Sequence, residues 1–445
     1  MSKLIVSVSG LRGVVGSDLT PAVVADFCAA YGSGLDGGRV IVSRDGRTTG
    51  EMVAHAAVAG LLSAGCTPVT VGVAATPTVG VLVRHLKAAG AIQVTASHNP
   101  PEWNGLKPFA ADGTILGPDE ATALADRFRS RDIPLADWSQ IRTTESYDDP
   151  HQPHLEQVLG QIDADAVRSH CFRVVLDANH GSGSRLGRRL LEALGCEVTL
   201  LGGEPDGRFD HPPEPLRENL GGLCRAVTER GADVGFAVDP DADRLAVVDE
   251  TGRYLGEENT LALVAEHVLA TKKGPVVVNC STSRAIQDLA ERNGCPFYRS
   301  KVGEANVVAV MKQRRAVLGG EGNGGVIDPR VGYVRDSMIG MALILELLDQ
   351  HPEPLSHVAG RLPVYVIVKD KIACTAEGVS AFYRALRGRF ADATEDRTDG
   401  LRLDWPDRWL HVRPSNTEPI VRIIAEGPDE QSATALCREA REVMR

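Results

Sequence analysis

The sequence predicts an α/β protein with three related α/β domains of mixed or parallel sheets, followed by a smaller α+β domain. The length of 445 residues exceeds what a single core usually holds, at a prior of roughly 150 residues per domain. The 46 glycines against 4% aromatic residues favour many tight turns between strands and helices. The same order of strand, loop and helix recurs three times and then stops after about residue 360.

Each repeat begins with a strand rich in β-branched residues that ends in a polar or glycine-containing loop. These segments are residues 40–47, 174–181 and 276–283. The helix that follows each of them runs into a glycine–cysteine pair, where glycine suits the left-handed residue that ends a helix. The pairs are Gly65-Cys66, Gly195-Cys196 and Gly294-Cys295. Alternating strands and helices imply right-handed crossovers and largely parallel sheets.

The third strand of each repeat ends in a loop with an unusual concentration of polar residues. These loops read TASHNP at 95–100, DPDADR at 239–244 and GEGNGG at 320–325. Ligands of open α/β sheets bind beyond the carboxyl ends of the strands, which makes all three loops candidate sites. The three domains are expected to span residues 1–150, 151–252 and 253–360.

The last part of the chain, residues 361–445, departs from the repeat and predicts the small α+β domain. Strands are expected at 364–368, 410–412 and 420–425, and helices at 376–387 and 428–445. The loop RPSNTEP, residues 413–419, joins two of these strands.

The acidic loop offers three carboxylates at alternate positions, Asp239, Asp241 and Asp243. In an extended or looping backbone they can turn toward one centre, and hard oxygen ligands at this density suit Mg²⁺ better than zinc. The alternative is a solvated acidic turn.

The TASHNP loop offers an exposed hydroxyl at Ser97, with His98 beside it and Lys107 ten residues on. Serine alone is a poor nucleophile and needs a base or a metal. A phosphoserine, however, would supply a fourth hard oxygen to a magnesium site made of three aspartates. The alternative is that Ser97 and His98 are ordinary turn residues.

The other two loops suit a sugar phosphate. Arg413, Ser415, Asn416 and Thr417 combine a guanidinium fork, hydroxyls and backbone amides into a possible phosphate cradle, and an ordinary hairpin turn is the alternative. In GEGNGG, Glu321 and Asn323 stand among glycines that allow close approach to a polyol, and a flexible turn is the alternative.

Composition disfavours several classes of binding partner and several cellular locations. The net charge of −11, without a basic stripe, argues against nucleic acid and anionic membranes. The nine cysteines form no Cys-x-x-Cys pair, which favours reduced cytosolic thiols. The chain has no signal-peptide core and no long apolar span, so a cytoplasmic protein is expected. No pattern indicates an oligomeric state.

Five ordered motifs, SGLRG at 9–13, TASHNP, DPDADR, GEGNGG and RPSNTEP, together resemble the α-D-phosphohexomutase family across nearly the whole chain. The resemblance implies three related domains and a distinct fourth around a central cleft. It also implies an isomerase that moves phosphate reversibly between O1 and O6 of a hexose, a phosphoprotein enzyme of carbohydrate metabolism.

The resemblance also implies roles for individual residues. Ser97 would carry the phosphate and join the three aspartates as Mg²⁺ ligands, while His98 and Lys107 would handle protons. Arg12 and Arg244 would offset the charge of the phosphoryl group. Glu321 and Asn323 would contact sugar hydroxyls, and residues Arg413, Ser415, Asn416 and Thr417 would grip the second phosphate. A hexose 1,6-bisphosphate would be the intermediate and, when added, an activator.

The sugar loop leaves the choice of hexose open. Bacterial relatives commonly carry Glu-x-Ser-Gly-His where this chain has Glu321-Gly-Asn-Gly-Gly325. GEGNGG together with SGLRG resembles the archaeal-type phosphoglucosamine mutase branch, which places glucosamine phosphate ahead of mannose or glucose phosphate. Remoter alternatives are a Mg²⁺-dependent sugar phosphatase with an aspartate nucleophile and a non-catalytic sugar-phosphate sensor. A dinucleotide-binding enzyme is weaker still, because residues 181–187 have one residue too many for G-x-G-x-x-G.

Overall fold

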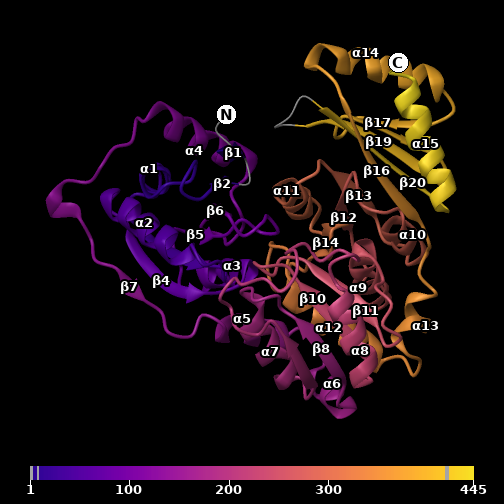
Figure 1. The fold of residues 1–445 in the computed structure, drawn as a ribbon, viewed down its shortest axis with the longest axis horizontal. Helices are drawn as coiled ribbons and strands as arrows, with labels where there is room; N and C mark the ends of the chain where they lie inside the picture. Colours follow the sequence, from indigo (N-terminus) through magenta and orange to yellow (C-terminus); the bar gives the residue numbers. More distant parts are fainter. Residues whose placement is uncertain (1–3, 8–9, 416–419, 445) are drawn as a thin grey trace. The chain divides into compact units, whose positions relative to one another are not determined.

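A computed structural model describes residues 4–7, 10–415 and 420–444 (Figure 1). The chain forms two compact units, and each unit is assembled from two separate segments. The first unit comprises Met1–His267 and Asn323–Gly360, and the second comprises Val268–Gly322 and Arg361–Arg445.

The first sheet of the first unit carries the Ser97 loop. Its strands lie in the order β1-β2-β6-β5-β3-β4-β7. Their bounds are β1 Ile5–Ser7, β2 Gly10–Val14, β3 Arg39–Arg44, β4 Thr67–Val73, β5 Gly90–Val94, β6 Trp103–Phe109 and β7 Glu145–Ser146. Strand β3 is parallel to β4 and β5, whereas β6 is antiparallel to β5 and β2. The sheet is therefore mixed, with a parallel centre.

Helices cover both faces of this sheet. Their bounds are α1 Pro21–Gly32, α2 Gly50–Ser63, α3 Thr76–His85 and α4 Pro118–Ser130. The chain steps from β3 outward to β4 and then back past β3 to β5, so right-handed crossovers place α2 and α3 on opposite faces (Figure 1). Phe27 of α1 and Leu61 of α2 are buried in one core with Ile92 of β5.

The second sheet carries the acidic loop and has the order β11-β10-β8-β9. The strands are β8 Arg173–Asp177, β9 Glu197–Leu201, β10 Val234–Val238 and β11 Leu245–Asp249. The helices of this region are α5 Gln152–Leu159, α6 Ala164–His170, α7 Gly183–Ala193 and α8 Gly221–Arg230. Only β11 runs antiparallel to its neighbour.

A helix from much later in the chain completes the first unit. Helix α12, Ser337–Asp349, contacts α5, α6 and α7. Its sequence SMIGMALILELLD is apolar on nearly every side, and almost all of it is buried. A helix that is hydrophobic all round belongs inside a protein, which explains this position.

The second unit contains the sugar loop and the C-terminal domain. Strand β12, Val276–Asn279, is parallel to both β13, Phe297–Ser300, and β14, Leu318–Glu321. The helices between these strands are α10 Ala285–Arg292 and α11 Glu304–Arg314.

Other elements along the chain are η1 Trp138–Gln140, α9 Glu257–Thr271, β15 Gly325–Ile327 and α13 Leu355–Ala359.

The C-terminal sheet is antiparallel, in the order β16-β20-β19-β18-β17. Its bounds are β16 Val366–Ala373, β17 Thr394–Asp396, β18 Leu401–Asp404, β19 Trp409–Pro414 and β20 Ile420–Gly427. Helices α14, Ala376–Arg389, and α15, Glu430–Glu442, pack on one face, where Leu386 and Leu436 share a core with Val412.

The fold class is confirmed: mixed α/β sheets are followed by an α+β domain. The three glycines expected to end helices do so with positive φ, at 76° for Gly65, 72° for Gly195 and 66° for Gly294. A strand at 364–368 was wrong in its bounds, because β16 begins at Val366 and Val364 is 70% exposed. Strand β17 was missed because its sequence, Thr-Glu-Asp, has no apolar alternation.

No helix among the described residues is long and apolar enough to cross a lipid bilayer.

Candidate active site

Ser97 is held in a left-handed turn at the end of a buried strand. The five residues of β5 are all buried, and the chain then turns at Ser97 with φ of +51°. The Ser97 amide donates to Thr95 Oγ1 over 2.9 Å, which stabilises the turn. Ser97 is 1% exposed, so the expectation of an exposed hydroxyl was wrong. The hydroxyl is buried against Asp239 of the acidic loop.

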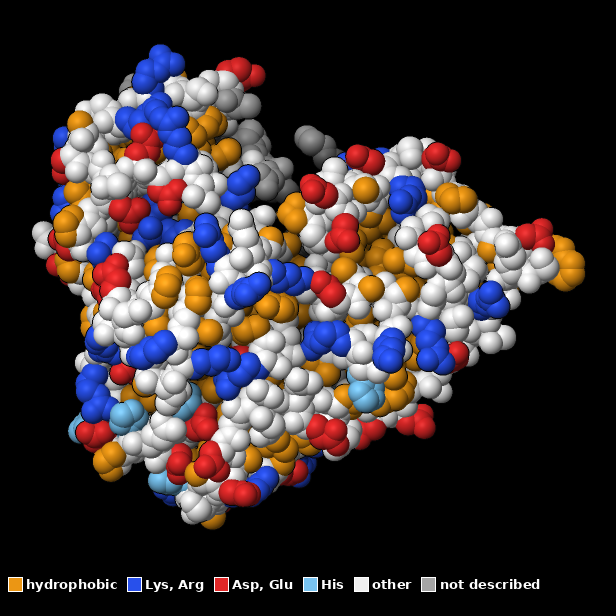
Figure 2. All heavy atoms as spheres, turned by 180° about the vertical axis from the view of Figure 1, so that it is seen from behind, with side chains coloured by type: hydrophobic (Ala, Val, Ile, Leu, Met, Phe, Trp, Pro, Cys, Tyr) orange, Lys and Arg blue, Asp and Glu red, His pale blue; other side chains and the backbone are white. Residues whose placement is uncertain are grey.

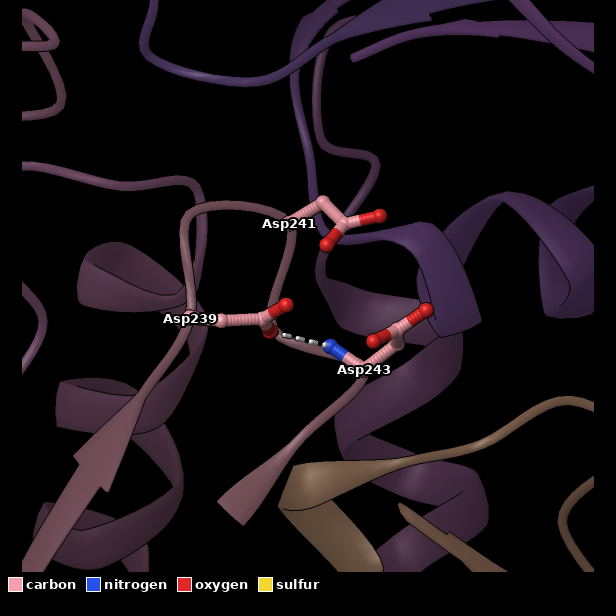
Figure 3. A group of neighbouring side chains, drawn as sticks. All are labelled: Asp239, Asp241 and Asp243. Atoms are coloured by element: carbon pink, nitrogen blue, oxygen red, sulfur yellow. Dashed lines mark hydrogen bonds between the residues drawn. The ribbon is translucent and has the colours of Figure 1, made fainter. Parts of the chain in front are cut away.

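Asp239, Asp241 and Asp243 converge after strand β10 (Figure 3). One carboxylate oxygen from each lies within 4.8 Å of the others, and all three residues are fully buried. Asp239 Oδ1 accepts hydrogen bonds from the amides of Asp243 and Arg244, each over 3.1 Å. The alternative of a solvated acidic turn is therefore wrong, because these carboxylates have no access to solvent.

The serine loop and the acidic loop meet directly. Ser97 Oγ donates to Asp239 Oδ2 over 3.1 Å. Lys107 Nζ lies 2.8 Å from Asp241 Oδ2 and 3.0 Å from Asp243 Oδ2. Residues separated by more than 130 positions thus form one cluster, as the resemblance implied.

Two oxygens of the cluster suit a cation. Asp241 Oδ1 and Asp243 Oδ1 are buried and accept no hydrogen bond. A buried carboxylate oxygen without a partner is costly unless a cation satisfies it. With the neighbouring Asp239 and Ser97 Oγ, the donor set consists of hard oxygens, which is the ligand type of Mg²⁺.

The electrostatics of the three carboxylates differ. Burial, together with the charges of Asp241 and Asp243, raises the pKa of Asp239 well above its usual value. Burial would also raise the pKa of Asp243, but Arg335, Lys107 and Arg244 outweigh it and lower that pKa. The protein therefore compensates the charge of Asp243, whereas Asp239 is the carboxylate short of positive charge.

Three further predicted residues border the cluster. His98 Nδ1 lies 3.2 Å from Ser97 Oγ, and burial with the charges of Arg244 and Arg12 lowers the pKa of His98 to about 3. Its imidazole is therefore neutral at physiological pH. Arg12 Nη1 donates to Asn99 Oδ1 over 3.3 Å, and Arg244 Nη1 lies 3.3 Å from Glu214 Oε1. Both guanidinium groups thus stand beside the two loops.

The remaining predicted residues are distributed over both units. Glu321 and Arg413 belong to the second unit, where Glu321 ends β14 and Arg413 lies on β19. The Ser415 amide donates to the carbonyl of Ile420 over 2.9 Å across the hairpin. Asn323 opens the second segment of the first unit. Two predicted residues lie outside the described part of the chain, Asn416 and Thr417.

Sequence reasoning missed two side chains that hold the aspartates. Thr76, the first residue of α3, donates from Oγ1 to Asp241 Oδ2 over 2.7 Å. Arg335 Nη2 donates to Asp243 Oδ2 over 2.7 Å. Neither residue lies in a motif, so no local pattern could have singled them out.

A buried ion pair fixes the Ser97 loop from behind. Arg47 is 2% exposed, and its Nε lies 3.2 Å from Asp45 Oδ2, which also accepts from Thr95 Oγ1 over 2.7 Å. The guanidinium donates at 2.6–2.9 Å to four loop carbonyls, those of Ser97, Asn99, Pro100 and Trp103. Its position beyond the carboxyl end of β3 was the signal that could have found this pair.

Four family models match the chain in sequence order. All describe phosphoglucomutase/phosphomannomutase: alpha/beta/alpha domain I at residues 3–133, domain II at 152–252, domain III at 257–365 and the C-terminal domain at 364–443.

Relatives of similar length also match. A "Phosphoglucomutase/phosphomannomutase" of Thermococcus kodakarensis is 36% identical and covers 95% of this chain and 94% of its own. A "Probable phosphoglucosamine mutase" of Methanopyrus kandleri is 34% identical, covering 98% and 97%.

Two solved structures share the fold of this chain. A phosphoglucomutase/phosphomannomutase family protein of Burkholderia thailandensis has a TM-score of 0.86 at 28% identity, covering 99% and 96%. An Aspergillus fumigatus N-acetylphosphoglucosamine mutase, in complex with GlcNAc-6P and magnesium, has a TM-score of 0.61 at 15% identity, covering 99% and 95%. The second likeness concerns the fold alone.

Proposed function

The chain belongs to the phosphoglucomutase/phosphomannomutase family, and from that premise we propose that it interconverts glucosamine 1-phosphate and glucosamine 6-phosphate. It is a phosphohexomutase, an enzyme of the isomerase class. One observation supports the mechanism most directly: the Ser97 hydroxyl lies 3.1 Å from Asp239 within a buried group of three aspartates.

We propose Ser97, Asp239, Asp241 and Asp243 as the ligands of a magnesium ion. The Oδ1 atoms of Asp241 and Asp243, which accept no hydrogen bond, and the raised pKa of Asp239 support a divalent cation at this place. The fungal N-acetylphosphoglucosamine mutase was solved with magnesium, which agrees with this choice. When bound, the ion would supply charge stabilisation to a phosphoryl group on Ser97.

The side chains around Ser97 serve positioning and charge compensation. A phosphoryl transfer through a loose transition state needs little covalent chemistry from the protein. Arg12 and Arg244 stabilise the charge of the phosphoryl oxygens, and the neutral imidazole of His98 can exchange a proton with the reacting hydroxyl. Lys107, whose Nζ donates to Asp241 and Asp243, is the second group proposed to exchange a proton with this hydroxyl.

The residues of the other loops bind the rest of the sugar phosphate. Glu321 and Asn323 contact sugar hydroxyls. The phosphate that is not reacting is bound by Arg413, Ser415, Asn416 and Thr417. Phospho-Ser97 first donates its phosphate to the free hydroxyl, which yields a 1,6-bisphosphate. This intermediate turns round and returns its other phosphate to Ser97. Loss of the bisphosphate leaves Ser97 unphosphorylated, so added hexose 1,6-bisphosphate should activate the enzyme.

Glucosamine phosphate is proposed ahead of mannose and glucose phosphates. The motif form GEGNGG supports this choice, and so does the name of the Methanopyrus kandleri relative. The Thermococcus kodakarensis relative carries the other name, and phosphomannomutase/phosphoglucomutase activity is accordingly the second candidate.

Turnover of the three sugar 1-phosphates tests this choice. Purified protein with Mg²⁺ and a catalytic amount of hexose 1,6-bisphosphate should convert glucosamine 1-phosphate fastest, as followed by phosphorus NMR. Faster conversion of mannose or glucose 1-phosphate would overturn the choice of sugar but not the reaction class.

Two variants test the mechanism. Asp241→Asn should lose most transfer activity while circular dichroism shows an intact fold; normal turnover with Mg²⁺ would contradict the metal assignment. Ser97→Ala should abolish mutase activity. If Ser97→Ala still released inorganic phosphate from sugar phosphates, a phosphatase with an aspartate nucleophile would replace the proposal.

The proposed partners are small sugar phosphates rather than nucleic acid or membranes. The whole sequence carries a net charge of −11, and the face drawn in Figure 2 shows acidic side chains as well as basic and apolar ones. A cytoplasmic location is part of the proposal, and the nine free cysteines support a reducing compartment.

A further inference from the structure

The carboxylate of Glu321 is fixed by two hydrogen bonds within the second unit. Asn279 Nδ2 donates to Glu321 Oε1 over 2.8 Å, and the amide of Gly303 donates to the same oxygen over 3.0 Å. Glu321 and Asn279 are each 5% exposed. The orientation of this sugar-loop carboxylate is thus set by β12 and by the turn before α11.

The same turn also contacts Asp399, which follows β17 and precedes β18. The amide of Val302 donates to Asp399 Oδ2 over 3.0 Å. That oxygen lies 3.4 Å from Arg413 Nε, and each of the two side chains is 17% exposed. Since Val302 and Gly303 are neighbours, one peptide turn gives an amide to the partner of Arg413 and the next amide to Glu321.

A buried histidine, His411, provides a second hydrogen-bonded link between Asp399 and the residues that hold Glu321. His411 Nδ1 lies 3.0 Å from Ser281 Oγ, and His411 Nε2 lies 2.6 Å from the carbonyl of Asp399. The amide of Ser281 donates to Asn279 Oδ1 over 2.8 Å, and Asn279 in turn holds Glu321. The hydrogen bonds therefore form a closed ring from Glu321 to Asp399 and back.

We propose that Asp399 is a positioning residue for Arg413, the residue that binds the phosphate that is not reacting. Asp399 aligns the guanidinium of Arg413 and, through the turn 302–303, fixes that guanidinium relative to Glu321. This inference rests on the proposed function, in which Arg413 binds phosphate and Glu321 binds sugar hydroxyls. Asp399 pairs with Arg413 through charge, without a hydrogen bond to Nε, on the stem side of the guanidinium. The two terminal nitrogens are then left for the phosphate. Asp399 acts through Arg413 and does not touch the substrate.

The physical benefit is preorganisation. An arginine side chain loses rotamer freedom when it binds a phosphate, and this loss weakens binding unless the protein has already restricted the side chain. The carboxylate of Asp399 restricts Arg413 before the substrate arrives. The ring applies the same restriction to Glu321, so that the sugar hydroxyls and the phosphate that is not reacting meet groups at a fixed separation.

Substitution of Asp399 in the full-length enzyme tests this role. Asp399→Asn keeps an acceptor for the Val302 amide but removes the charge that faces Arg413. We expect KM for the preferred sugar 1-phosphate to rise on the order of tenfold, with kcat within about twofold of the original value. Asp399→Glu keeps the charge and should bring KM back to within about threefold of the original enzyme.

A double-mutant cycle separates positioning from a merely structural role. In an Arg413→Ala background, Asp399→Asn should raise KM no further, because the group it positions is gone. Additive effects in this background, or an unchanged KM in the single variant, would overturn the inference. The matched control is Asp370→Asn, which removes the 3.0 Å ion pair between β16 and Arg441 of helix α15 and should leave KM unchanged.

The experiment also separates this inference from the proposed function. Absence of turnover by the unmodified enzyme with all three sugars would contradict the proposed function. An active enzyme whose KM ignores Asp399 would contradict this inference alone.

Discussion

At the scale of single residues, one guanidinium holds much of the loop that carries the proposed phosphate-bearing residue, Ser97. Arg47 donates to four carbonyls of the loop that contains Ser97 and pairs with Asp45 in a site closed to solvent. A lysine keeps the charge but cannot reach four acceptors, since its three donors project from a single nitrogen. In such a variant the loop should lose its fixed conformation, although the residues of the loop itself are unchanged.

Arg47→Lys is therefore expected to lower kcat at least tenfold with little change in KM. The free energy of unfolding should fall by about 2 kcal/mol, because buried carbonyls lose charged donors. Steady-state kinetics and urea unfolding measure the two effects. The control is Arg39→Lys, whose exposed partner is Glu145. Equal kcat values for both variants would disprove the assignment.

Ser97 itself stores conformational strain. A φ of +51° is unfavourable for any residue with a Cβ atom by roughly 1–2 kcal/mol, and glycine avoids most of this cost. Ser97→Gly and Ser97→Ala both lose the hydroxyl and should both be inactive. The glycine variant should nevertheless unfold at a higher temperature than the alanine variant. Equal or reversed melting temperatures would show that the turn is unstrained.

Residue chemistry decided which positions were predictable. Ser97 and the three aspartates could be predicted because their side chains are unusual at the ends of strands and because they fall into motifs. Thr76 and Arg335 could not, because their roles depend on contacts with residues 165 and 92 positions away. A long-range contact leaves no trace in the local pattern of either residue.

At the scale of elements, the first turn of α3 holds Asp241, one of the proposed metal ligands. Thr76 gives its amide to the carbonyl of Asp241 over 2.9 Å and its hydroxyl to the carboxylate over 2.7 Å. Groups that orient a metal ligand typically affect metal affinity by about 10–100-fold. Thr76→Val keeps the shape and removes only the hydroxyl, so it should weaken Mg²⁺ binding about tenfold.

Isothermal titration with Mg²⁺ measures this effect without reference to turnover. Thr78→Val is the matched control, because its hydroxyl lies in the same helix and contacts His154 Nδ1 at 2.9 Å instead. If both variants bound Mg²⁺ equally, the support from α3 would be structural only.

Strand β19 contributes a dependence of stability on pH. His411 is fully buried, and burial lowers its pKa from 6.5 to about 4. Between these values the unfolded chain binds a proton that the folded chain does not, so the free energy of unfolding falls as the pH drops from 6.5 toward 4. The stabilisation, about 3 kcal/mol at most, is complete above pH 6.5.

Urea unfolding between pH 7.5 and 4.5 tests this dependence. His411→Gln can still donate and accept but cannot titrate, so its unfolding free energy should fall less steeply with acid over this range. A variant with the same acid slope as the original protein would exclude His411 as a source.

The elements that were predictable share a strong apolar pattern. The β-branched strands and the glycine-terminated helices were confirmed, because burial on both faces leaves a clear signal. Strand β18, Leu401–Asp404, alternates apolar and polar residues for only four positions and was not predicted. A strand of four residues carries too few apolar positions to be distinguished from a loop.

At the scale of the whole molecule, the order of the motifs was predictable but the assembly of the units was not. The domain boundaries expected from the sequence, including one at residue 252, stay predictions. The contact pattern instead divides the chain so that α12 belongs with residues 1–267. Hydrophobicity alone indicates that α12 is buried, but it does not identify the helices that α12 contacts.

Because each unit is assembled from two separate segments, the protein faces a constraint while it folds during synthesis. As the chain leaves the ribosome, residues 1–267 emerge before α12, so the apolar surface of α6 and α7 that α12 covers stays open until about residue 360 has been made. Residues 268–322 must likewise wait for the C-terminal segment. A chain truncated at His267 should therefore bind hydrophobic dyes and chaperones. Nascent chains of this protein should depend on chaperones until α12 has been synthesised, and not only until residue 267 has been reached.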